Sequence, residues 1–174
     1  MRYRKILVAL DRSPQAEAVF EQALELATKE EASLMVFHCM SLELPRSGLY
    51  GEIYGTALTD FSGELQAQWK QEKEEVQEWL TSYYQRATAY GVPTQWALKL
   101  GEAARAIREL ADSWNADLVV LGRRGHRGLA EVVLGSVSNH VIHHAPCSVL
   151  VVQGINPTVV DTPEAATQAK SKEQ

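Results

Sequence analysis

Gly122, Gly125 and the pair Gly135–Ser136 are the residues of this chain whose types and spacing could do chemistry. Two residues separate the first two glycines, and nine separate Gly125 from Gly135. Glycine lets the backbone approach a phosphate group closely, and the free N–H groups and positive dipole at a helix start attract negative charge. The apolar run 117–121 predicts a buried strand before the glycines, and 135–144 predicts a helix. The pattern therefore predicts a phosphate site, and with it a nucleotide-binding protein.

Two better-known phosphate motifs do not occur at the places they require. The dinucleotide fingerprint G-x-G-x-x-G should follow the first strand, where this chain has the sequence Asp11-Arg-Ser-Pro14. The P-loop needs a glycine followed by lysine, and no glycine of this chain is followed by lysine. The sequence therefore argues against both NAD-type and P-loop chemistry.

Charged side chains near the glycines have two interpretations. Arg123, Arg124, His126 and Arg127 could compensate the charge of a triphosphate, with Mg²⁺ bridging the phosphates to Asp11. Alternatively, this loop is solvated and its arginines only keep the surface soluble. Asp11 likewise either contacts a ligand or serves as a turn carboxylate for the residues after it. We favour the ligand role, because the end of a strand is where ligands bind in α/β proteins.

The other histidines and the two cysteines do not predict a metal site. His140 and His144 have the i, i+4 spacing of metal ligands but lack the glutamate of an HExxH motif, and we interpret them as exposed residues near a helix C-terminus. We expect His38, inside an apolar strand, to be a core histidine. Cys39 and Cys147 form no CxxC pair. Cys147 is expected to be a small buried hydrophobe, and Cys39 to be either core or part of the nucleotide site.

Strands and helices alternate along the chain. Ser13 is expected to cap the first helix with Pro14 at its first position, Gly91 to end the second helix, and 40–63 to form a loop. Helical connections force parallel pairing, so we expect a doubly wound, five-stranded parallel α/β sheet with helices on both faces. The carboxyl ends of the strands, where Asp11, Cys39 and Gly122 lie, form the expected ligand site. The expected strands are 5–10, 33–39, 92–100, 117–121 and 147–152, and the expected helices 13–31, 65–90, 102–114 and 135–144.

Composition limits the class of protein. The chain has 174 residues, 45% of them hydrophobic, and a net charge of −5, which favours one domain and argues against a binder of nucleic acid or of a membrane surface. No apolar run approaches the roughly 20 residues needed to cross a bilayer. With two distant cysteines and no secretory signal pattern, we expect a cytoplasmic protein. The domain is expected to span 1–153, with a small, polar and disordered tail over 154–174.

The glycine pattern resembles the ATP-binding signature G-x2-G-x9-G-[ST] of the universal stress protein family. Asp11 followed by Ser13 and the ending Ala145-Pro-Cys-Ser-Val-Leu-Val-Val152 are also similar to that family. The resemblance extends over roughly 1–152. It implies a Rossmann-like fold of the adenine nucleotide alpha hydrolase-like type. At one position the chain departs from the family pattern. Ser148 follows Cys147, where the family usually has proline.

The resemblance also implies which residues would meet ATP or another adenine nucleotide such as AMP. Ala9, Leu10 and Cys39 would border the adenine, and Asp11 would lie near the ribose and phosphates, where it could also bind Mg²⁺ through the phosphates. The residues implied around the sugar and phosphates are Leu121, Gly122, Arg123, Gly125, Arg127, Gly135, Ser136 and Val137. A hydroxyl and consecutive amides at a helix start independently suit phosphate oxygens.

Three functions follow from these observations. The first is an ATP-binding universal stress protein that acts as a nucleotide-dependent stress sensor or regulator. It would form a homodimer through its last strand, 149–152, which has little charge to protect its edge. The second is a slow ATP hydrolase, although no residue is an evident water-positioning base. The third is a nucleotide-free protein-interaction module on the same fold.

Overall fold

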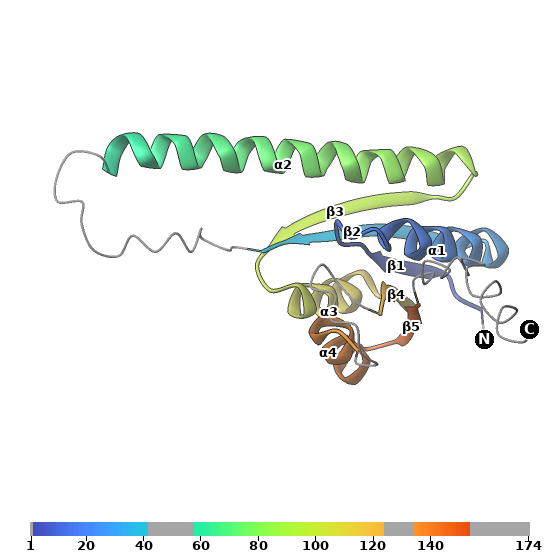
Figure 1. Cartoon of the computed structure of the whole chain (residues 1–174). Helices are drawn as coiled ribbons and strands as arrows, with labels where there is room; N and C mark the ends of the chain where they lie inside the picture. The colour runs from blue at the N-terminus through green and yellow to red at the C-terminus, as the bar shows by residue number, and fades with distance from the viewer. Residues whose placement is uncertain (1, 42–57, 124–133, 154–174) are drawn as a thin grey trace, which may run out of the picture.

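Five parallel strands form one sheet in the order β3-β2-β1-β4-β5 (Figure 1). The computed structural model describes residues 2–41, 58–123 and 134–153. The strands are β1 (Lys5–Ala9), β2 (Ser33–Met40), β3 (Thr94–Leu100), β4 (Leu118–Gly122) and β5 (Ser148–Val152). The helices are α1 (Ala16–Glu30), α2 (Leu58–Ala89), α3 (Ala103–Trp114) and α4 (Ser136–His144). The doubly wound α/β sheet predicted from the sequence is confirmed.

The three inner strands consist of nearly continuous apolar runs because both of their faces are covered. Ile6, Leu7 and Val8 of β1 are fully buried, as are Val119 and Val120 of β4. A strand with one solvated face would instead alternate apolar and polar residues. The edge strands β3 and β5 are only partly buried. The burial pattern thus agrees with the strand order.

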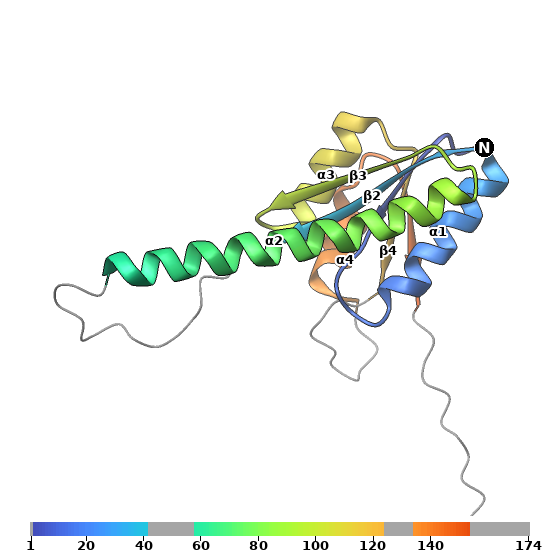
Figure 2. The same ribbon diagram turned by 90° about the horizontal axis from the view of Figure 1, so that it is seen from above.

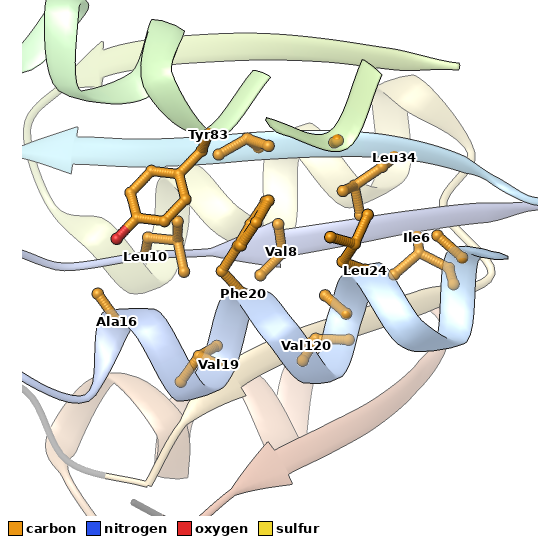
Figure 3. Close-up of a cluster of buried hydrophobic side chains, with 14 of the residues drawn as sticks. Ile6, Val8, Leu10, Ala16, Val19, Phe20, Leu24, Leu34, Tyr83 and Val120 are labelled. Carbon is orange, nitrogen blue, oxygen red and sulfur yellow. The ribbon is translucent and has the colours of Figure 1, made fainter. Parts of the chain in front are cut away.

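The sheet divides the hydrophobic core into two layers, because successive side chains of a strand point to opposite faces. Helices α1 and α2 cover one face, and α3 and α4 cover the other (Figures 1 and 2). In the first layer, Phe20 of α1 lies between Val8 and Tyr83 of α2, with ring centroids of Phe20 and Tyr83 4.6 Å apart (Figure 3). In the second, Leu7 packs with Ile107 of α3.

Helix α2 ends as the sequence predicts. Gly91 has φ +77°, a left-handed conformation that glycine adopts without strain, and its N–H donates to the Thr88 carbonyl at 2.9 Å. The N–H of Val92 then donates to the Ala87 carbonyl at 3.2 Å, so the last carbonyls of α2 have partners. This turn sends the chain directly into β3.

The start of α2 is earlier than predicted. The sequence analysis placed residues 40–63 in a loop, whereas β2 continues to Met40 and α2 begins at Leu58. A single glycine, Gly63, is tolerated within the helix because it costs only about 1 kcal/mol relative to alanine. In Figures 1 and 2 the N-terminal part of α2 extends past the carboxyl edge of the sheet.

The start of α1 also differs from the prediction. The helix begins at Ala16, with Gln15 in place of Ser13 at the N-cap. Ser13 instead caps the turn just before the helix: its hydroxyl accepts from the Gln15 N–H at 3.3 Å, and its carbonyl accepts from the Ala16 N–H at 3.1 Å. Serine and proline thus begin a separate turn, which places Asp11 at the edge of the sheet.

Candidate functional site

The candidate site lies at the carboxyl edge of the sheet, where the strand order reverses. From β1 the chain continues outward to β2 and β3, and then returns to place β4 and β5 on the other side of β1. Ala9, at the end of β1, is the register partner of both Phe37 in β2 and Leu121 in β4. Crevices at such reversals are the usual ligand sites of open α/β sheets. The fold therefore brings the predicted Ala9, Leu10 and Leu121 to one place.

Asp11 forms a tight turn directly after β1. Its Oδ1 accepts from the Ser13 N–H at 3.2 Å and from the Ser13 hydroxyl at 2.5 Å. This is the turn role that the sequence allowed as an alternative to ligand binding. The contacts engage Oδ1 and hold the half-buried carboxylate at the edge of the sheet.

The N-terminus of α4 lies at the same edge, because this helix follows β4. Its N-cap is Gly135, which has extended backbone (φ −62°, ψ 156°) and provides no side-chain cap. The N–H groups of the first helical residues, Ser136 and Val137, have no partner within the helix. Ser136 is exposed, and Val137 is partly buried against the second core layer. Two consecutive amides and a hydroxyl therefore lie at the end of the helix where its dipole is positive.

The amide of Gly135 has a backbone partner in this structure. The sequence analysis placed Gly135 among the residues around the sugar and phosphates, and here its N–H donates to the Arg123 carbonyl at 2.9 Å. The Arg123 N–H in turn donates to the Val152 carbonyl at 2.9 Å, so the end of β4 is tied to both β5 and α4. In this structure the Gly135 amide helps to fix the helix start, and the next two amides along the chain are those of Ser136 and Val137.

Ser138 is a structural residue of the site that the sequence analysis did not identify. It is buried, and its hydroxyl lies 2.9 Å from the Arg123 carbonyl and 3.0 Å from the Gly135 carbonyl. It thereby ties the end of β4 to the start of α4. A serine in the first turn of a predicted helix is the signal that could have found it.

Helix α3 starts at the same edge but is already capped. Both carboxylate oxygens of Glu102 accept backbone N–H groups, those of Ala104 and Arg105, each at 3.0 Å. The negative charge of Glu102 satisfies these donors and opposes a second anion there. Of these two helices, α4 is therefore the one suited to a phosphate.

His38 joins the first and second strands beneath the site. Its Nδ1 lies 2.7 Å from the Leu10 carbonyl, and its ring meets Trp79 of α2 edge-on at 5.3 Å. The side chain is 8% exposed, which confirms the predicted core histidine. Burial is the main cause that lowers its pKa, so the imidazole is neutral at neutral pH.

Cys39 occupies the end of β2, one strand further from Leu121. Its thiol is half-buried and lies 3.5 Å from the Gly101 carbonyl. Burial, and then the nearby charge of Glu102, raises the pKa of this thiol. Cys39 is therefore a protonated, weakly polar group that packs against the same core layer as Ala9 and Val137.

Several predicted residues lie outside the described residues. Gly125 and Arg127, with Arg124 and His126 beside them, belong to 124–133. In the described part of the chain, no three His, Cys, Asp or Glu side chains gather as metal ligands do. His140 and His144 are exposed and stack on each other with centroids 4.2 Å apart.

A parallel α/β sheet with a glycine-capped helix start beside its strand-order reversal is typical of a class of nucleotide-binding folds. The model of the universal stress protein family matches residues 2–153. A universal stress protein of Synechocystis sp. is 50% identical over 153 residues, covering 88% of this chain and 99% of that protein. The chain belongs to the universal stress protein family.

Solved structures of the family share this fold. A universal stress protein in complex with cAMP superposes with a TM-score of 0.59 at 24% identity, covering 87% of this chain and 98% of that chain. A family protein from Arabidopsis thaliana with AMP bound also gives a TM-score of 0.59, at 20% identity, covering 87% and 92%. In the residues that the structure describes, no helix is long and apolar enough to cross a membrane.

Proposed function

We propose that this protein binds an adenine nucleotide, with ATP as the primary ligand, at the carboxyl edge between β1 and β4. The observation that carries the proposal is the start of α4, where the N-cap residue Gly135 provides no side-chain cap for the amides of the first helical residues, Ser136 and Val137. These donors bind the outer phosphates. Ala9 and Leu10 border the adenine on one side, and Cys39 borders it at the end of β2.

The glycines support this proposal in a second way. The backbone of Gly135 has an extended conformation that any residue can adopt. Conformation therefore does not explain the glycine, whereas close approach of a phosphate does. Gly122 and Gly125 contact the sugar and inner phosphates, and Arg123 and Arg127 compensate phosphate charge. These assignments come from the family signature G-x2-G-x9-G-[ST].

The bound state of two proteins with this fold agrees with an adenine ligand, since one structure holds cAMP and another holds AMP. For a triphosphate, Asp11 would contribute its Oδ2 to a phosphate-bound Mg²⁺, because Ser13 occupies its Oδ1. The ion would supply charge neutralisation, and Asp11 would orient it. Carboxylate and phosphate oxygens are ligands that Mg²⁺ prefers.

On this basis the protein acts as a nucleotide-dependent regulator in the cytoplasm, as a homodimer. The outer edge of β5 supports the dimer, since β4 is its one neighbour in the described sheet. We further propose that the functional domain spans 1–153 and that 154–174 form a disordered tail, which lies outside the described residues.

Calorimetric titration with ATP, ATP plus Mg²⁺, AMP and cAMP tests the proposal. We expect saturable binding of at least one adenine nucleotide and the same nucleotide in protein denatured after purification. GTP serves as the matched control, because it carries the same phosphates on a different base. Absence of binding heat with all adenine nucleotides at millimolar concentration would refute the function.

A further inference from the structure

The Leu10 carbonyl is held by a side chain at the point where β1 leaves the sheet. The β1–β2 register ends at the pair Ala9–Phe37, and the Leu10 N–H still donates to the Phe37 carbonyl at 2.9 Å. The next group along the chain, the Leu10 carbonyl, lies 2.7 Å from His38 Nδ1. The imidazole thus determines where the backbone carbonyl before Asp11 points.

The chemistry of this contact fixes the tautomer of His38. A carbonyl only accepts hydrogen bonds, so Nδ1 must carry the proton. In the neutral ring Nε2 then has a lone pair, and a second proton would place a charge inside the core. The ring is packed edge-on against Trp79, and the side chain is 8% exposed.

Charged groups face His38 from two elements. Asp11 and Arg12 follow β1, and Glu72 belongs to α2. The two carboxylates favour the charged ring and Arg12 disfavours it, while burial outweighs the other causes and lowers the pKa. His38 is thereby kept neutral at a site flanked by both signs of charge.

We propose that His38 is a positioning residue of the nucleotide site: its Nδ1–H holds the Leu10 carbonyl and so places Asp11. This inference rests on the proposed function. A second proton would add to Nε2 and leave this donor in place, so the positioning depends on the Nδ1–H group and not on the charge of the ring. Loss of the donor weakens nucleotide binding through a residue that does not touch the nucleotide.

Two variants separate the hydrogen bond from the other properties of the ring. In His38→Asn the amide nitrogen is the same number of bonds from Cα as Nδ1, so it can donate to the Leu10 carbonyl. His38→Leu removes the donor. We expect His38→Leu to lower ATP affinity roughly tenfold or more, the scale of one lost buried hydrogen bond. We expect His38→Asn to restore wild-type affinity at pH 7.5.

The deciding experiment is ATP affinity by calorimetry at pH 7.5 for the wild type, His38→Leu, His38→Asn and the matched control His143→Asn. We expect His38→Asn and His143→Asn to bind as the wild type does, and His38→Leu to bind roughly tenfold more weakly. Thermal unfolding checks that the variants are folded. Wild-type affinity in folded His38→Leu, or no recovery of affinity in His38→Asn, would overturn the proposal.

A measurement without nucleotide distinguishes this inference from the proposed function. NMR of the imidazole nitrogens in the nucleotide-free protein should show Nδ1 protonated at neutral pH. The Asp11 amide signal should move with the titration of His38. An Nε2–H tautomer, or an Asp11 amide signal that does not change during the titration of His38, would overturn the positioning role. Failure of the wild type to bind ATP at any pH would instead overturn the proposed function.

Discussion

At the scale of single residues, the site depends on backbone groups held in place by other backbone groups. Arg123 links β5 and α4 through its backbone. Its N–H donates to the Val152 carbonyl, and its carbonyl accepts from the Gly135 N–H. Ser138 contacts two carbonyls of the same segment. The amides of Ser136 and Val137 are therefore fixed before a ligand arrives, and preorganisation of this kind increases affinity.

Gly135→Val is expected to abolish ATP binding, because its side chain would enter the space that a phosphate must occupy. The fold should survive, since valine can adopt the extended conformation of this residue. Calorimetry measures the affinity, and thermal unfolding checks the fold. A folded variant with wild-type affinity would contradict the phosphate site.

Ser136→Ala should weaken ATP binding about fivefold to tenfold, since it removes one hydrogen bond worth about 1 kcal/mol and leaves the amides in place. Asn139→Ala is the control, because Asn139 is an exposed residue one turn further along α4. Affinities of the two variants measured side by side decide the question. Equal affinities would exclude a direct contact by the Ser136 hydroxyl.

The free energy of unfolding should decrease as pH falls below about 6.5, the ordinary pKa of histidine. Burial lowers the pKa of His38 in the folded protein, so the unfolded chain takes up this proton first, and acid favours unfolding. Urea unfolding between pH 5 and 8 measures the slope. The free energy of unfolding of His38→Asn should depend less on pH than that of the wild type. If the exposed-site variant His143→Asn lost the pH dependence and His38→Asn kept it, this assignment would be contradicted.

At the scale of elements, the ends of the helices determine which of them can meet a ligand. Glu102 satisfies the first donors of α3, whereas Gly135 leaves those of α4 without a side-chain cap. The C-terminal ends close with left-handed residues: Glu31 after α1, Asn115 after α3 and Gly91 after α2. The helices are thus fixed at the ends away from the site.

Gly91→Ala is expected to destabilise the protein by about 1 kcal/mol, because a Cβ disfavours its φ of +77°. The added Cβ would meet no atom within 4 Å, so this change isolates the conformational term. The matched variant Gly63→Ala also adds a Cβ to open space, but within α2, and should not destabilise. Unfolding free energies that fall equally in both variants would contradict this explanation.

The order of elements could be predicted because the signals are local. Apolar runs predicted the strands, and Gly91 predicted the end of α2, which the structure confirms. The start of α2 could not be predicted, because Thr59, Asp60 and Ser62 are all suitable caps and Gly63 follows them, so no single start is favoured. The true helix start after Ser13 was also missed, since the serine caps a turn rather than the helix.

The candidate site was predictable to the level of strand ends and not to that of hydrogen bonds. The positions of Ala9, Asp11 and Ser136 at one edge follow from the parallel topology. The hydrogen bond from the Gly135 amide to the Arg123 carbonyl could not be predicted, because it depends on how β4 and α4 are joined. The contact between His38 and Leu10 spans 28 residues of sequence, so it exists only once β1 and β2 have paired.

At the scale of the whole molecule, β5 is an edge strand of the described sheet, and we propose that it pairs with a second copy. The Arg123 N–H donates to the Val152 carbonyl, so even-numbered residues of β5 face β4. Val149 and Val151 consequently direct their backbone groups outward. Edge strands with few charges are sites of strand pairing between subunits.

Val151→Pro should convert the proposed dimer into a monomer, because it removes an outward N–H while leaving the β4–β5 ladder intact. Light scattering coupled to size exclusion measures the mass, and circular dichroism checks the fold. The chain mass of 19.3 kDa sets the expected monomer value. A folded variant that remains dimeric would show that β5 is not the interface.

Amide NMR of the isotope-labelled protein during titration with ATP tests the nucleotide site most directly. The account predicts saturable shifts at Ala9, Leu10, Asp11, Ser136 and Val137, and no shift at Ser33 or Asp117, which lie at the opposite edge of the sheet. The account would be contradicted if the amides at the start of α4 did not shift at saturating ATP, or if shifts appeared only at the opposite edge of the sheet.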